Sequence, residues 1–100
     1  MRSISDVRSG FGVLENGTQL QTAAMILKDG DASGPLGNEH PQSEQVLYVV
    51  SGEVEAEIGD RRFRMRAGDS AIVPAGLPHR FTNRGSEPAL TFNVYAPKAY

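Results

Sequence analysis

The stretch that decides the fold is Glu53–Arg66, EVEAEIGDRRFRMR, in which apolar and polar residues alternate on both sides of Gly59-Asp60. A glycine followed by an aspartate between two alternating runs is typical of a tight two-residue hairpin turn. We therefore predict two antiparallel strands with Ile58 opposite Arg61. The period of two indicates strands and not helices, because successive side chains on a strand point to opposite faces.

The register of this hairpin gives each side chain a partner. Opposite charges then share one face and apolar side chains the other, as half-buried antiparallel strands require. An anion site made by the arginines is the alternative, but cross-strand pairing already explains every residue, so we expect a solvated, charge-paired outer face. The expected pairs are Glu57–Arg62, Glu55–Arg64, Glu53–Arg66, Ala56–Phe63 and Val54–Met65.

The rest of the chain continues the pattern of short apolar runs between turn residues, with 11 glycines and 6 prolines among 100 residues. Such spacing favours an all-β sandwich or barrel. The length predicts one domain over residues 1–100, with residues 1–10 loosely held because they contain few apolar anchors. Strands are expected at 11–14, 20–27, 46–50, 54–58, 63–65, 70–73, 79–82 and 89–95, and a long connection at 29–41.

Composition excludes several classes of function. The net charge of −2 gives no basic surface, so nucleic acid is not an expected partner. With no cysteine, the chain has no disulfide, thiol nucleophile or zinc–thiolate site, which is compatible with a reducing cytoplasm. No apolar stretch reaches the length of a signal peptide or a bilayer span, so a membrane is not an expected partner either.

Beyond the hairpin on its C-terminal side lies GDSAIVPAGLPHRFTN, residues 68–83. Its fixed residues are Gly68, Pro74, Gly76, His79 and Asn83, and their spacing resembles the second motif of the cupin family. The resemblance implies an all-β cupin double-stranded β-helix, or jelly-roll, barrel. It also implies that His79 begins a strand and faces the barrel interior.

On its N-terminal side lies NEHPQSEQVLYVVSGE, residues 38–53, which resembles the first cupin motif with Gly52 as the motif glycine. The family spacing then puts Gln45 at the usual glutamate position and His40 and Asn38 at the two histidine positions. The chain departs from the family at Asn38 and Gln45. A register that takes His40 and Gln42 as the two histidine positions leaves too few residues before Gln45.

The resemblance implies a divalent metal site made by Asn38, His40, Gln45 and His79. The alternative is a metal-free barrel in which these side chains hydrogen-bond to one another and to water. Asn38 and His40 share a face by alternation, whereas Gln45 has the opposite parity, so a turn or bulge is needed at residues 41–44. Glu39 and Glu44 should point outward. The four donors are neutral, and a carboxylate-containing iron oxygenase triad is absent, so zinc, nickel, copper, iron and manganese all remain candidates.

Three functions are compatible with this site. The first is metal-assisted oxygenation or isomerisation of a small carbonyl or phenolic compound, and the second is non-enzymatic binding of a small molecule or metal. The third is a structural dimer without a ligand. Phe81 and Phe92 are candidates to line the barrel, but we favour plain core packing for both. The apolar, aromatic stretch TFNVYAPKAY at 91–100 and the exposed sheet edges predict a homodimer.

Overall fold

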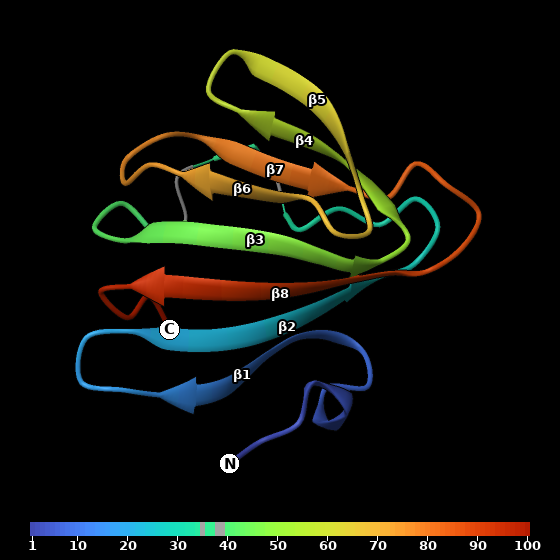
Figure 1. The fold of residues 1–100 in the computed structure, drawn as a ribbon. Helices are drawn as coiled ribbons and strands as arrows, with labels where there is room; N and C mark the ends of the chain where they lie inside the picture. Colours follow the sequence, from blue (N-terminus) through green and yellow to red (C-terminus); the bar gives the residue numbers. More distant parts are fainter. Residues whose placement is uncertain (35, 38–39) are drawn as a thin grey trace.

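The computed structural model describes residues 1–34, 36–37 and 40–100. Within them, eight strands form two antiparallel sheets (Figure 1). None of the helices in the described residues is long and apolar enough to cross a membrane. In chain order the elements are the short 3₁₀ helix η1 (Ile4–Asp6), β1 (Gly10–Asn16), β2 (Gln21–Leu27), β3 (Glu44–Ser51), β4 (Glu53–Ile58), β5 (Arg61–Arg66), β6 (Ser70–Val73), β7 (His79–Thr82) and β8 (Ala89–Ala96).

The larger sheet has the strand order β1-β2-β8-β3-β6, and the smaller sheet has the order β5-β4-β7. Figure 1 shows the last strand, β8, in the middle of the larger sheet between β2 and β3. Every strand expected from the sequence is present, and most extend a residue or two beyond the expected ends. The all-β cupin barrel predicted from the two motifs is confirmed.

Buried side chains from both sheets form one apolar cluster. Leu47 and Val49 of β3 meet Val54 and Ala56 of β4, and Phe81 of β7 is 1% exposed within the same cluster. The alternation along each strand places these side chains on the inner faces of the sheets. The apolar core therefore fills the barrel next to the connection between β3 and β4. A polar site occupies the opposite end, where β3 and β7 begin.

The hairpin has the predicted register throughout, including Glu55 opposite Arg64. The expectation of a uniformly solvated outer face was wrong at Glu57, which is only 6% exposed. The reason is the neighbouring strand β7, which sets Arg80 beside Glu57 in the sheet. Arg80 Nε lies 2.9 Å from Glu57 Oε1, and Arg62 Nη2 lies 3.3 Å from Glu57 Oε2.

Gly52 explains in physical terms why the first motif ends on a glycine. Its φ of 78° lies in the left-handed region, where a side chain is unfavourable. A Cβ atom at this position would also lie 2.7 Å from the carbonyl oxygen of Pro88 and 2.8 Å from Cα of Ala89. The β3–β4 connection therefore passes so close to the start of β8 that only glycine fits.

The outer face of the larger sheet carries apolar side chains that remain exposed. Val46, Tyr48 and Val50 of β3 are 37%, 40% and 38% exposed, and Ile72 of β6 is 62% exposed. Phe92 lies on this outer side, because it alternates with the buried residues of β8 and is only half-buried. The suggestion that Phe92 lines the barrel was therefore wrong, whereas Phe81 does face inward.

Candidate functional site

His40 lies just before β3 and is 4% exposed. A turn at Pro41 and Gln42 follows it, and the amide of Ser43 donates to the carbonyl oxygen of His40 at 3.1 Å. Because the turn folds the chain back, the Nδ1 atom of His40 lies 3.0 Å from the carbonyl oxygen of Ser43. The break that parity required between residues 41 and 44 is therefore present, and it fixes the imidazole ring.

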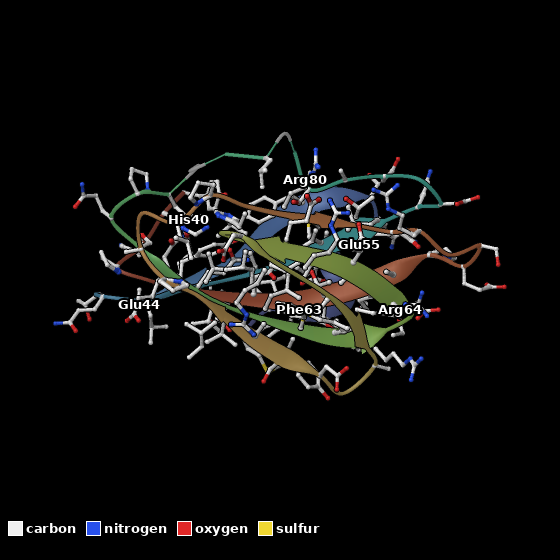
Figure 2. The ribbon with its side chains drawn as sticks, turned by 90° about the horizontal axis from the view of Figure 1, so that it is seen from above. His40, Glu44, Glu55, Phe63, Arg64 and Arg80 are labelled. Carbon is white, nitrogen blue, oxygen red and sulfur yellow. The ribbon has the colours of Figure 1, made fainter. Side chains whose placement is uncertain are left out.

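Gln45 is on the inner face of β3 and is 4% exposed, whereas its neighbour Glu44 is exposed. Its Oε1 atom lies 2.9 Å from Nε2 of His40. Figure 2 shows Glu44 at the same end of the barrel as His40 and at the opposite end from Arg64. The prediction that Gln45, and not Glu44, turns inward agrees with these positions.

His79 is the first residue of β7 and is 6% exposed. Its backbone amide donates to the carbonyl oxygen of Gly37 at 3.0 Å, which ties the loop before His40 to the start of the strand. Its Nδ1 atom lies 3.0 Å from the carbonyl oxygen of Leu77. The rings of His40 and His79 are 4.5 Å apart between centroids, so the two histidines of the chain meet inside the barrel.

The contacts of the two rings determine which nitrogen carries the lone pair. A carbonyl oxygen only accepts a hydrogen bond, so Nδ1 of each ring carries the proton. In the neutral ring Nε2 then carries the lone pair that can bind a metal. Second contacts of this kind orient histidines that bind metals through Nε2. In this tautomer, His40 Nε2 and Gln45 Oε1 both present lone pairs across 2.9 Å. A shared cation satisfies both atoms, and so does rotation of the Gln45 amide, which turns its NH₂ group to the ring.

These residues fit a divalent cation as a neutral set of two imidazole nitrogens and one amide oxygen. The described part of the chain contains no cluster of three or more histidine, aspartate, glutamate or cysteine side chains that could hold a metal. Asn38, the fourth residue assigned from the sequence, lies outside the described residues, as does Glu39.

Asn83, the last residue of the second motif, has a structural role. Its Nδ2 atom donates to the carbonyl oxygens of Leu27 at 2.9 Å and Glu87 at 2.7 Å, and its Oδ1 accepts from the amide of Gly85 at 2.8 Å. With 1% exposure, this side chain fastens the loop after β7 to the end of β2. It thereby holds β7, and with it His79, in place.

A cavity of about 210 Å³ is bordered by two of the site residues, His79 and Gln45. Sequence reasoning missed five of the residues that line it: Phe11, Met25, Ser33, Tyr95 and Tyr100. Tyr95 had a signal, because β8 was predicted and its alternation places Tyr95 on the buried face. Phe11 and Tyr100 had none, since their positions depend on how the two ends of the chain approach each other. The complete lining is Phe11, Met25, Ser33, Gln45, His79, Phe81, Tyr95 and Tyr100.

The charged side chains cluster outside the barrel, on the smaller sheet. The pKa of Glu57 is lowered chiefly by the hydrogen bond from Arg80, with Arg62 adding to the effect and burial opposing it. The pKa of Arg80 is raised by the same carboxylate. Figure 2 shows Arg80 and Glu55 on this sheet, away from the end that carries Glu44. The arginines are therefore paired with the glutamates of the hairpin and leave the cavity uncharged.

Two motifs, the strand order and the position of the histidine pair define a small cupin barrel. A family model described as the cupin domain matches residues 23–95, and the chain belongs to that family. The match spans β2 to β8, so it includes His40, Gln45 and His79.

The chain resembles proteins of known sequence and proteins of known structure. The polyketide synthase CurC of Streptomyces cyaneus is 40% identical over 62 residues, covering 59% of this chain and 40% of CurC. A Klebsiella pneumoniae protein with a double-stranded β-helix domain superposes with a TM-score of 0.85 at 26% identity, covering 100% of this chain and 92% of the other. A sugar phosphate isomerase from Silicibacter pomeroyi gives a TM-score of 0.74 at 26% identity, covering 89% and 60%. The chain spans between 33% and 48% of the length of the curated relatives it matches.

Proposed function

We propose that this barrel holds one divalent metal through Nε2 of His40, Nε2 of His79 and Oε1 of Gln45, and acts on a small carbonyl compound in the adjoining cavity. Asn38 is the fourth ligand that the motif assigns. The observation that carries the proposal is the pair of buried imidazoles, 4.5 Å apart, each with its Nδ1 proton directed to a backbone carbonyl. Contacts of this kind orient histidines that bind metals through Nε2.

The chemistry that the metal supplies when bound is polarisation of a substrate oxygen. The carbonyls of Ser43 and Leu77 fix the two rings, so the protein does not have to order them when a metal binds. Met25 and Phe81 provide an apolar wall that keeps water away from part of the cavity and strengthens local electrostatic interactions. The backbone thus orients the donor atoms while the side chains of the wall control the medium.

Isomerisation fits the site better than oxygenation. The non-haem iron oxygenases use two histidines and one carboxylate, and the described inward-facing residues here supply an amide in place of the carboxylate. The names of two relatives support the same class of chemistry, because polyketides and sugar phosphates are both carbonyl compounds with acidic neighbouring C–H groups. The proposed reaction is therefore transfer of a proton from the carbon next to the carbonyl to solvent water and its return to the substrate, because the described lining holds no carboxylate or amine base.

The second candidate is a barrel that binds its ligand without turnover. It is favoured by one observation: among the described residues, the cavity lining contains no aspartate, glutamate or lysine that could act as a general base. Solvent deuterium incorporation next to the carbonyl of hydroxyacetone separates the two. Metal-dependent incorporation above the rate of free metal supports the isomerase, and its absence in metal-loaded protein supports the binding module.

The metal itself is tested by elemental analysis of protein purified without a histidine tag, followed by titration with zinc, nickel, iron(II), manganese and copper(II). We expect one metal per chain and a loss of at least about tenfold in affinity for His79→Ala, which removes one of two nitrogen donors. Gln42→Ala, at an exposed position in the turn between His40 and β3, is the matched control and should bind as the parent does. Protein that carries no metal and binds none of the five ions contradicts the proposal.

A further inference from the structure

Aromatic rings form a continuous series from the surface to the two histidines. At the surface, Phe11 and Tyr100 are 40% and 53% exposed, and their ring centroids lie 4.7 Å apart. Tyr95 follows at 5.1 Å from Tyr100 and 5.1 Å from His40, which in turn lies 4.5 Å from His79. The spacings are those of interacting ring pairs, and most of the contacts are tilted or edge-to-face. We call Phe11, Tyr95 and Tyr100 the aromatic mouth.

Gln21 holds the aromatic mouth in place. Its side chain is fully buried, with 0% exposure. Its Oε1 atom accepts from the backbone amides of Tyr100 at 3.0 Å and Ala99 at 3.2 Å. Its Nε2 atom donates to the carbonyl oxygen of Tyr100 and to Oδ1 of Asn16, both at 2.7 Å. One side chain thus fixes the backbone of the segment that carries Tyr100 over the cavity.

The lining indicates the charge of the ligand. None of the lining residues that the structure describes is an aspartate, glutamate, lysine or arginine. Arg80 and Arg62 are engaged in ion pairs with Glu57 on the smaller sheet. A phosphorylated or otherwise anionic ligand would lose its hydration without gaining a counter-charge from these side chains, which is costly. The ligand should therefore be neutral apart from any oxygen directed to the metal position.

The volume of the cavity indicates the size of the ligand. The cavity measures about 210 Å³. An apolar protein cavity of about 150 Å³ is large enough to bind benzene. The cavity here therefore takes a single six-membered ring with a small substituent, and a larger ligand needs Tyr100 to move.

We propose that the barrel selects a neutral aromatic compound of one substituted ring, held edge-to-face or tilted against Tyr95, Tyr100 and Phe11 with its polar substituent toward His40 and His79. This inference deepens the proposed function and rests on it for the role of the polar substituent. Gln21 is a positioning residue, since it acts through the segment that carries Tyr100. Each ring contact favours an aromatic ligand over a saturated one of the same shape, because the ring edge and face carry opposite partial charges.

The test measures dissociation constants by NMR titration of chelator-treated protein with phenol, with cyclohexanol, which has nearly the same size, and with phenyl phosphate, which adds a charged group. We expect phenol to bind about tenfold more tightly than cyclohexanol, and phenyl phosphate to bind more weakly than phenol. Equal affinity for phenol and cyclohexanol, or tighter binding of phenyl phosphate, overturns the proposal.

Variants locate the preference. Tyr100→Ala should reduce the affinity for phenol about fivefold and bring it near that for cyclohexanol, whereas Tyr100→Phe keeps the ring and should retain the preference. Gln21→Met, which conserves volume but cannot hold the Tyr100 backbone, should resemble Tyr100→Ala in binding while keeping a folded amide spectrum. Unchanged phenol binding in Tyr100→Ala contradicts the assignment of the mouth.

The outcomes also separate this inference from the proposed function. A preference for phenol in protein that never binds metal leaves the aromatic mouth established and refutes the metal site. Metal binding without a preference for phenol refutes the mouth and leaves the metal site intact. Repeating the phenol titration with the metal-loaded protein then shows whether the hydroxyl gains affinity from the metal position.

Discussion

Nε2 of His40 and Oε1 of Gln45 lie 2.9 Å apart inside the barrel, although His40 precedes a turn and Gln45 follows it on β3. A turn at Pro41 and Gln42 reverses the parity between them and brings both side chains inward. The pair contains no carboxylate, and it faces His79 on β7. Its response to added charge provides the first prediction.

Gln45→Glu should tighten divalent metal binding by at least about tenfold, because a carboxylate adds a negative charge to an otherwise neutral set of donors. Competition titration against a metal-binding dye measures the change. Glu44→Gln is the control, and it should have little effect because Glu44 is exposed. A greater loss of metal from Glu44→Ala than from Gln45→Ala would show that the carboxylate of Glu44, and not the amide, binds the metal.

Glu57→Gln should make the free energy of unfolding depend less on pH in the acid range. The pKa of Glu57 is lowered in the folded protein, first by Arg80, so its contribution is complete above the unfolded value near 4.3 and is lost as the pH falls through the folded pKa. Urea unfolding between about pH 3 and pH 7 measures this. The variant should be less stable than the parent at neutral pH, and the difference should shrink toward the acid end.

The matched control for this prediction is Glu53→Gln. The carboxylate of Glu53 lies 3.7 Å from Arg64 and 3.8 Å from Arg66, but its side chain is 45% exposed, so solvent screens both pairs. A constant difference between parent and Glu57→Gln across the whole pH range would mean that the variant acts through packing alone.

Thr82→Val should stabilise the protein by up to about 1 kcal/mol. Oγ1 of Thr82 is buried and has no hydrogen-bond partner among the described residues, so folding removes its hydration without replacement. Valine has the same shape and suits a strand. Thr22→Val is the contrasting variant, because Thr22 Oγ1 accepts from the amide of Glu15 at 3.2 Å and its loss should destabilise. Chemical denaturation of both variants gives the comparison, and a destabilised Thr82→Val would indicate that the hydroxyl binds an ordered water.

A homodimer remains a prediction, and the structure suggests a more specific surface for it. The exposed apolar side chains Val46, Tyr48, Val50 and Ile72 lie on the outer face of the larger sheet, whereas Tyr95 and Tyr100 of the C-terminal stretch are used inside the mouth. Ile72→Lys should shift the mass measured by light scattering at micromolar concentration from dimer to monomer. Leu20→Lys is the control, since Leu20 is 48% exposed but lies outside that face. A parent protein that is monomeric at this concentration contradicts the prediction.

Local patterns were sufficient to predict the strands and the hairpin. The alternation about Gly59 and Asp60 specifies the pairs of β4 and β5 without any long-range information, and the structure has all of them. The inward direction of Gln45 followed from the resemblance to the first cupin motif, and its opposite parity then required the break at residues 41–44. In each case the information lies within about a dozen neighbouring residues.

What the sequence could not show depends on contacts between distant segments. Glu57 reads as a surface residue in the hairpin, and its burial follows only from Arg80 on the next strand. Phe92 was a candidate for the barrel interior because it is aromatic, although its parity relative to Tyr95 points it outward. Tyr100 lines the cavity because Gln21, far away in the sequence, binds its backbone. No local pattern encodes such pairings.

The position of β8 has a consequence for how the chain assembles. This strand, the last of those described, lies between β2 and β3, so neither has its inner neighbour in the sheet until residue 96 is available. During synthesis the hairpin of β4 and β5 is complete early, because its partners are adjacent in sequence. The larger sheet must wait with two apolar strand edges unpaired, a long-range closure that slows folding and exposes the intermediate to aggregation. The interval between the synthesis of β3 and the synthesis of β8 therefore determines how long a chaperone or a second nascent chain can bind the intermediate.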